Sequence, residues 1–117
     1  MNYIAIPGMK WRGTYEENQT IASLPKRQER VLKAVMQHFN ISWIEMNSKC
    51  RKRRVLLPRQ ISMYLLHKLL GMGCVDVAKM FDADHTTAIH NFKLIQDLID
   101  TNDNFANEIR GIRENII

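Results

Sequence analysis

The residues whose types best suit a specific chemistry are four consecutive ones: Asp84, His85, Thr86 and Thr87. An aspartate can accept a hydrogen bond from the amino group of cytosine, and a histidine can donate one to guanine. A threonine offers a hydroxyl to a base edge and a methyl group to the methyl of thymine. At the exposed start of a helix, such side chains would read bases in a major groove, but a plain capped helix also begins with polar residues. Type and spacing alone leave both interpretations open.

A dense basic segment is the second set of candidate residues. Residues 49–60 contain no acidic residue and six basic ones, namely Lys49, Arg51, Lys52, Arg53, Arg54 and Arg59. Residues 49–54 lack apolar periodicity, so we expect a loop there. Basic side chains on DNA phosphates give strongly salt-dependent binding, and an arginine-rich loop beside a recognition helix can enter the minor groove. A solvated charge run or a patch for acidic lipid would have the same composition.

The elements that must hold these residues are predicted to be helices throughout. Apolar residues recur at helical spacing from Ser23 to a stop at Asn40. They recur again from Pro58, which is expected to open a helix, to Gly71 and Gly73, which are expected to end it. Serine suits an N-cap, and asparagine or glycine suits a helix C-terminus, which sets these boundaries.

Shorter stretches complete the predicted core. Residues 42–47 are interpreted as one helical turn that closes one end of the core with Trp43, Ile44 and Met46. The helix that follows Asp84 is expected to bury Ala88, Ile89, Phe92, Ile95 and Ile99. A final amphipathic helix carries Phe105, Ile109 and Ile112.

Residues 74–81 and 85–99 are two predicted helices that only three residues join, Asp82-Ala83-Asp84. A short helix, a tight turn and a second helix with a free start are the parts of a helix-turn-helix. Asp84 is expected to be the N-cap of the second helix. The predicted fold is therefore all-α, a compact helical bundle that contains a helix-turn-helix.

The overall composition fits one small basic domain. The chain has 117 residues, a net charge of +5 and 45% hydrophobic residues. We expect a weakly structured extension over residues 1–23 and a domain over residues 24–117. Cys50 and Cys74 are expected to be free thiols. No apolar run approaches the roughly 18 residues of a membrane span and no signal peptide is recognisable, so we expect a cytoplasmic, nucleoid-associated protein.

Catalysis and cofactor binding have no support in the sequence. The four histidines fall on different predicted elements, and no spacing typical of a zinc site or of a nucleotide-binding loop occurs. We therefore expect no enzymatic activity, no metal and no cofactor. The alternative to DNA binding is a basic amphipathic helical domain for acidic lipid or a protein partner, because residues 26–39 have a basic and an apolar side. A small helical core needs the same apolar stripe.

Three motifs, in this order, give the chain a recognisable pattern. They are Ser48-Lys49-Cys50-Arg51-Lys52-Arg53, Pro58-Arg59-Gln60-Ile61-Ser62-Met63-Tyr64-Leu65 and Asp84-His85-Thr86-Thr87-Ala88-Ile89-His90. Residues 31–99 thereby resemble the C-terminal DNA-binding domain, domain IV, of the bacterial chromosomal replication initiator DnaA. The resemblance implies a Trp-repressor-like helix-turn-helix fold, double-stranded DNA as the partner, and a role in replication initiation or its regulation.

The resemblance also implies roles for individual residues. Asp84, His85 and Thr86 match positions that read bases in the major groove, and Thr87 is adjacent to them. Arg51 matches an arginine that enters the minor groove, whereas Arg59 and Gln60 match residues that grip backbone phosphate. Supporting backbone contacts are expected from Lys49, Lys52, Arg53, Arg54 and His90. The implied target is an asymmetric, A/T-leaning DnaA box, bound by a monomer.

The chain departs from the family pattern at the turn. Many members have a glycine after the residue that matches Phe81 and a basic residue before the matching aspartate, whereas Asp82-Ala83-Asp84 is shorter and more acidic. Two carboxylates near the DNA are expected to weaken phosphate contacts or to shift the preferred sequence. Because residues 1–23 do not resemble the helical lid that precedes this domain in the family, we expect a complete stand-alone protein. Whether it promotes or blocks initiation is left open.

Overall fold

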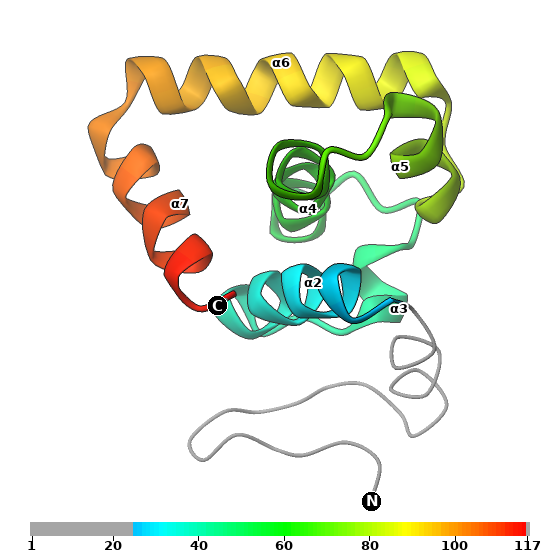
Figure 1. Cartoon of the computed structure of the whole chain (residues 1–117), viewed down its shortest axis with the longest axis horizontal. Coiled ribbons are helices and arrows are strands. Elements are labelled where there is room, and N and C mark those ends of the chain that lie inside the picture. The colour runs from blue at the N-terminus through cyan, green and yellow to red at the C-terminus, as the bar shows by residue number, and fades with distance from the viewer. Residues whose placement is uncertain (1–24, 117) are drawn as a thin grey trace, which may run out of the picture.

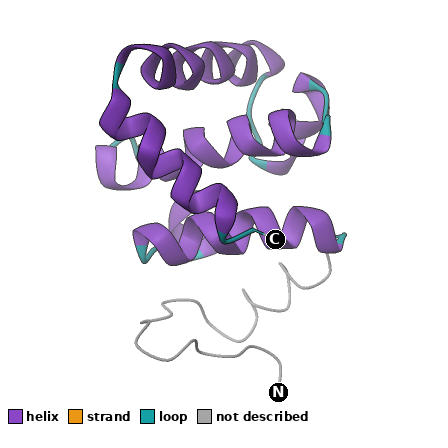
Figure 2. Ribbon diagram, turned by 60° about the vertical axis from the view of Figure 1, so that its left-hand side comes forward, coloured by secondary structure: helices purple, strands orange, loops and turns teal. Residues whose placement is uncertain are grey.

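Helix α4 (Arg53–Leu70) runs through the middle of the structure, and the other helices pack around it (Figure 1). The structure is a computed structural model that describes residues 25–116. The other described helices are α2 (Lys26–Phe39), α3 (Trp43–Met46), α5 (Cys74–Met80), α6 (His85–Thr101) and α7 (Asp103–Glu114). No strand occurs between residues 25 and 116 (Figure 2), which confirms the predicted all-α fold.

The central position of α4 follows from its sequence. Every residue from Ile61 to Leu66 is buried, including the polar Ser62. A helix segment that is buried on all sides needs a neighbour on each side, and α2 and α6 cover α4 from opposite sides (Figure 1). The fully buried side chains come from several helices and include Leu32, Met36, Leu65, Ile95 and Ile112.

Helix α2 uses its apolar stripe for this core. The stripe packs against α4 and α7 and consists of the buried residues Val31, Leu32, Ala34, Val35 and Met36. The basic residues at the start of α2 are exposed. The apolar side that also suited a lipid-binding helix is therefore already covered by protein.

The ends of the helices follow from side-chain chemistry and backbone conformation. Asn40 and Gly71 adopt the left-handed conformation after α2 and α4, with φ of 52° and 69°, and both are the predicted stops. Ser42 and Glu45 form a reciprocal capping box at the start of α3. The side chain of Asn102 accepts a hydrogen bond from a first-turn N–H of α7. Asn102 therefore caps the start of α7 directly after the end of α6.

Pro58 lies inside α4 rather than at its start, so the predicted boundary is wrong. The helix begins at Arg53, with Lys52 as an extended N-cap residue. Pro58 cannot donate the hydrogen bond of an ordinary helical residue, but Val55 and Pro58 are both buried and lie almost one turn apart, so this first part of α4 packs into the core. Arg53 and Arg54 therefore belong to the helix, and the basic loop, residues 47–52, ends two residues earlier than predicted.

Two residues that were predicted for the core are exposed. Ile44 is 59% exposed and Ile89 is 49% exposed. In the single turn of α3 only Met46 is buried. Ile89 faces solvent because α6 buries only one face, which is formed by Ala88, Asn91 and Ile95, and successive positions of a helix point in directions about 100° apart.

Cys50 and Cys74 are free thiols, as predicted. Among the described residues, no helix is long and apolar enough to cross a membrane, and no three histidine, cysteine or acidic side chains gather in a way that could hold a metal ion. The extension predicted for residues 1–23 and the cap predicted at Ser23 lie outside the described residues.

Candidate nucleic-acid interface

The turn between α5 and α6 is closed by backbone hydrogen bonds. The N–H of Asp82 donates to the carbonyl of Lys79 at 3.3 Å, and the N–H of Ala83 donates to the carbonyl of Ala78 at 2.9 Å. This pair of bonds is a Schellman motif, in which one residue after the helix adopts the left-handed conformation. Asp82 does so, with φ of 52°. Aspartate tolerates this conformation better than most side chains, so the turn keeps its geometry without the glycine of the resembling family.

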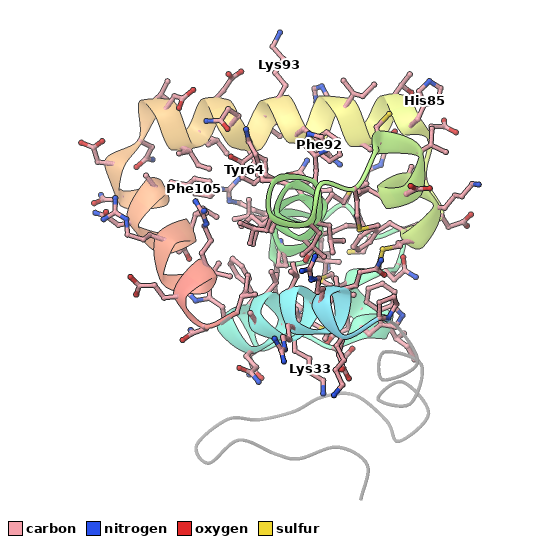
Figure 3. The ribbon with its side chains drawn as sticks, viewed as in Figure 1. Lys33, Tyr64, His85, Phe92, Lys93 and Phe105 are labelled. Atoms are coloured by element: carbon pink, nitrogen blue, oxygen red, sulfur yellow. The ribbon has the colours of Figure 1, made fainter. Side chains whose placement is uncertain are left out.

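The start of α6 carries the predicted base-reading residues on the surface. Asp84 is the N-cap by backbone position, but its carboxylate makes no capping hydrogen bond. Asp84, His85, Thr86 and Thr87 are all exposed, and His85 lies at the end of α6 that is farthest from α7 (Figure 3). The first-turn N–H groups of a helix have no partner within the helix. This end of α6 therefore offers backbone donors together with side-chain donors and acceptors.

An exposed apolar residue shares this face of α6. Ile89 lies four residues after His85 and three after Thr86, and such positions are on one side of a helix. At 49% exposure, Ile89 leaves half of its surface beside these polar residues. Val75, near the start of α5, is 50% exposed. The sequence did not identify either residue as a surface residue. For Ile89 the available signal was that it directly follows Ala88, since neighbouring positions of a helix point in different directions.

The structure brings the basic loop and the helix-turn-helix to opposite sides of one groove. This loop–turn groove has a volume of about 610 Å³. Lys49 and Arg51 line it from the loop, and the turn residues and Thr87 line it from the other side. More than thirty positions separate these two sides in the sequence. The residues of the first and third motifs are thus neighbours in space.

Arg59, which was predicted at the phosphate backbone, is bonded to the basic loop. Its guanidinium donates to the carbonyl of Cys50 at 3.0 Å and to the carbonyl of Ser48. A longer contact of 3.4 Å reaches the carbonyl of Met46. Burial lowers the pKa of the Arg59 guanidinium. These hydrogen bonds attach the basic loop to α4 and stabilise its conformation.

Gln60, the other residue predicted at phosphate, links α4 to α6. Its amide donates to the side-chain oxygen of Asn91 at 3.0 Å. Asn91 is buried and its own amide contacts the sulfur of Met63 at 3.2 Å. This chain of contacts sets the position of α6, and with it the position of the base-reading residues, relative to α4.

The other predicted backbone-contacting residues lie on the surface. Lys49, Arg51, Lys52, Arg53, Arg54 and His90 are all exposed. Arg54 pairs with Glu45 at 3.1 Å, and Lys49 pairs with Asp82 at 3.6 Å. Arg51, Lys52 and Arg53 form no ion pair among residues 25–116, so their charge is not neutralised within this part of the chain.

A short helix, a closed turn and a long helix with an exposed polar start, beside a loop of unneutralised cations, define a DNA-binding helix-turn-helix domain. The family model described as the bacterial dnaA protein helix-turn-helix matches residues 28–95. The chain belongs to this family. The match covers α4, α5 and most of α6, and so includes both sides of the loop–turn groove.

Curated relatives of the chain are named chromosomal replication initiator protein DnaA. The chain is 35% identical over 86 residues to the chromosomal replication initiator protein DnaA of Thermomicrobium roseum, covering 73% of this chain and 18% of that protein. It is 30% identical over 103 residues to the DnaA protein of Bdellovibrio bacteriovorus, covering 87% and 21%. It is 36% identical over 87 residues to that of Wolbachia pipientis, covering 74% and 19%. The chain spans about a fifth of the length of these relatives.

Proposed function

We propose that the protein binds double-stranded DNA sequence-specifically at a site like the DnaA box. The observation that carries this proposal is the loop–turn groove, where the exposed polar start of α6 faces the cations of the basic loop. A duplex that received α6 in its major groove would present a backbone and a minor groove to the neighbouring loop. One docking geometry thus uses both sets of residues.

Base reading is assigned to the first turn of α6. Asp84 accepts from cytosine, His85 donates to guanine, and the hydroxyls of Thr86 and Thr87 reach base edges. The carboxylate of Asp84 is available for this role because it makes no capping bond. Ile89 adds an apolar contact for thymine methyl groups, since it is exposed on the same side of the helix.

Backbone and minor-groove contacts are assigned to the basic loop and the start of α4. Arg51 is proposed to enter the minor groove, and Lys49, Lys52, Arg53, Arg54 and His90 are proposed to contact phosphate. The hydrogen bonds of Arg59 and Gln60 support a positioning role for both. Their direct contact with phosphate, which the resemblance implies, stays a prediction.

The named relatives support a proposed biological role. They are chromosomal replication initiators, so we propose that occupancy of box-like sites by this protein contributes to replication initiation or regulates it. The location of action would be the nucleoid, with the domain at residues 24–117 bound as a monomer to an asymmetric site. Acidic lipid is disfavoured as the ligand because the apolar stripe of α2 is buried.

Fluorescence anisotropy on two labelled duplexes tests the proposal. One duplex carries a DnaA box and the other has the same bases scrambled, and both are titrated across a salt series. We expect tighter binding to the box at every salt concentration and a steep loss of affinity for both duplexes as salt rises. Equal and weak binding to both duplexes would refute sequence-specific recognition.

A further inference from the structure

A second groove lies away from the loop–turn groove, where α4, α6 and α7 meet. This α7 groove has a volume of about 410 Å³. Tyr64 lies in this region, between α6 and α7 (Figure 3). Thr87 lines the loop–turn groove and Gln96 lines the α7 groove, and nine residues of helix separate them by about 13 Å. A ligand held between α4 and α7 would thus be separate from the proposed DNA contacts.

Three basic side chains line the α7 groove. Lys68 comes from α4, and Arg110 and Arg113 come from successive turns of α7. All three are exposed, and none forms an ion pair among residues 25–116. These cations stand over an apolar floor made by Leu65, Leu69, Ile99, Ala106 and Ile109.

Two acidic side chains on the helices that form the groove, Glu108 and Asp100, are engaged with other groups. The carboxylate of Glu108 lies 2.8 Å from the imidazole of His38 on α2. The carboxylate of Asp100 accepts a hydrogen bond from the amide of Gln96 at 3.0 Å. Gln96 in turn accepts one from the hydroxyl of Tyr64 at 2.6 Å. Tyr64 and Gln96 are therefore hydrogen-bonded, whereas Lys68, Arg110 and Arg113 form no ion pair among residues 25–116.

We propose that the α7 groove binds an acidic amphipathic helix of a partner protein. Cations on an apolar floor complement a helix that carries carboxylates beside leucine-like residues. Arg110 and Arg113 are three positions apart, which matches the spacing of carboxylates on one side of a partner helix. Since the cations are exposed at the rim, the groove suits a surface ligand better than an enclosed small molecule.

The proposal does not depend on DNA recognition. The test can therefore be made on this protein either free or bound to DNA. The probe is a labelled peptide of about 20 residues, above the roughly 12–15 residues below which isolated helices are marginal, with glutamates three positions apart beside a leucine stripe. Peptide binding is measured by anisotropy on the full chain, and the contact site by NMR with ¹⁵N-labelled protein. We expect shifts at Lys68, Ile99 and Ala106.

Charge-reversal variants test the assignment of the cations. Arg110→Glu with Arg113→Glu should weaken peptide binding about tenfold, because two ion pairs become repulsions. Arg27→Glu with Arg30→Glu is the matched control: both arginines are exposed on α2, have the same spacing and lie outside the groove. Lys68→Glu should also weaken binding, and it keeps the test informative if the α7 variant folds poorly.

Four results would overturn the proposal. They are no peptide binding, an equal loss in the α2 control, shifts confined to the basic loop, and stronger competition at the same residues by a single-stranded oligothymidine than by the unlabelled peptide. The last result would assign the groove to nucleic acid. DNA-box affinity is expected to fall no further in the α7 variant than in the control, which separates this proposal from the proposed function.

Discussion

The side-chain ammonium of Lys49 donates a hydrogen bond at 2.9 Å to the main-chain oxygen of Asp82, which lies 33 positions further along the chain. The bond ties the basic loop to the turn of the helix-turn-helix across the loop–turn groove. It therefore fixes the distance between the residues proposed for the DNA backbone and those proposed for the bases. It also places a cation beside one of the two carboxylates at this surface.

Replacing Asp82 tests what that carboxylate does. Asp82→Gly should keep the turn, because glycine favours the positive φ of this position, and should tighten binding to both duplexes by about 0.5 kcal/mol as one anionic group is removed. Asp82→Ala also removes the carboxylate but should lower the free energy of unfolding by about 1 kcal/mol. Anisotropy and urea unfolding give the two values. Weaker DNA binding by Asp82→Gly would show that the ion pair with Lys49 matters more than repulsion.

Replacing the first-turn residues of α6 tests base reading. His85→Ala or Thr86→Ala should cost about 1–3 kcal/mol on the box and much less on the scrambled duplex. Both side chains are exposed, so the free energy of unfolding should change little. Asp97→Ala, an exposed position further along α6, is the control and should bind both duplexes as the unmodified protein does. A loss that is equal on both duplexes would contradict base reading.

Replacing the free cations of the loop and the α4 start tests phosphate contact. Lys52→Ala or Arg53→Ala should weaken binding to both duplexes alike and reduce the slope of log K against log salt by about one unit. Neither residue has an ion pair to lose among residues 25–116. The slope comes from anisotropy across the salt series. An unchanged slope would place these side chains away from the phosphates.

Arg59 is expected to act through the loop. Arg59→Ala removes a donor from two loop carbonyls, those of Ser48 and Cys50, and should cost about 1–3 kcal/mol of stability. Arg59→Lys keeps the charge but not the planar fork of donors, so it should restore only part of that loss. Urea unfolding measures stability, and NMR shifts of residues 47–52 report the loop. Full stability of Arg59→Ala with weaker DNA binding would instead favour direct phosphate contact.

Ile89 and Ile95 form a matched pair on α6. Ile89→Ala should change the free energy of unfolding by less than about 0.5 kcal/mol, because the side chain is half exposed. Ile95→Ala should cost about 2–5 kcal/mol, because Ile95 is fully buried. On DNA, Ile89→Ala should reduce the preference for the box over the scrambled duplex. An unchanged preference would remove Ile89 from the proposed base-reading surface.

The helix-turn-helix could be predicted from the sequence because its signals are local. The polar start of α6, the short turn and the apolar spacing of the two helices all lie within residues 74–99, and each acts through neighbours in the chain. The stops at Asn40 and Gly71 are local as well, because they depend on the left-handed conformation of one residue. The three motifs that carry the family resemblance are likewise short stretches of sequence.

Other features required the tertiary structure because long-range packing decides them. The burial of Val55 and Pro58 against the core moves the start of α4 to Arg53, against the local tendency of proline to begin a helix. The exposure of Ile89 depends on which face of α6 meets α4. The inward bonds of Arg59 and Gln60 depend on loop carbonyls and on Asn91, which only the packed helices bring within reach. The sequence by itself thus identified the candidate DNA-contacting residues, and the packing around α4 decided that Arg59 and Gln60 bond inward while the start of α6 stays exposed.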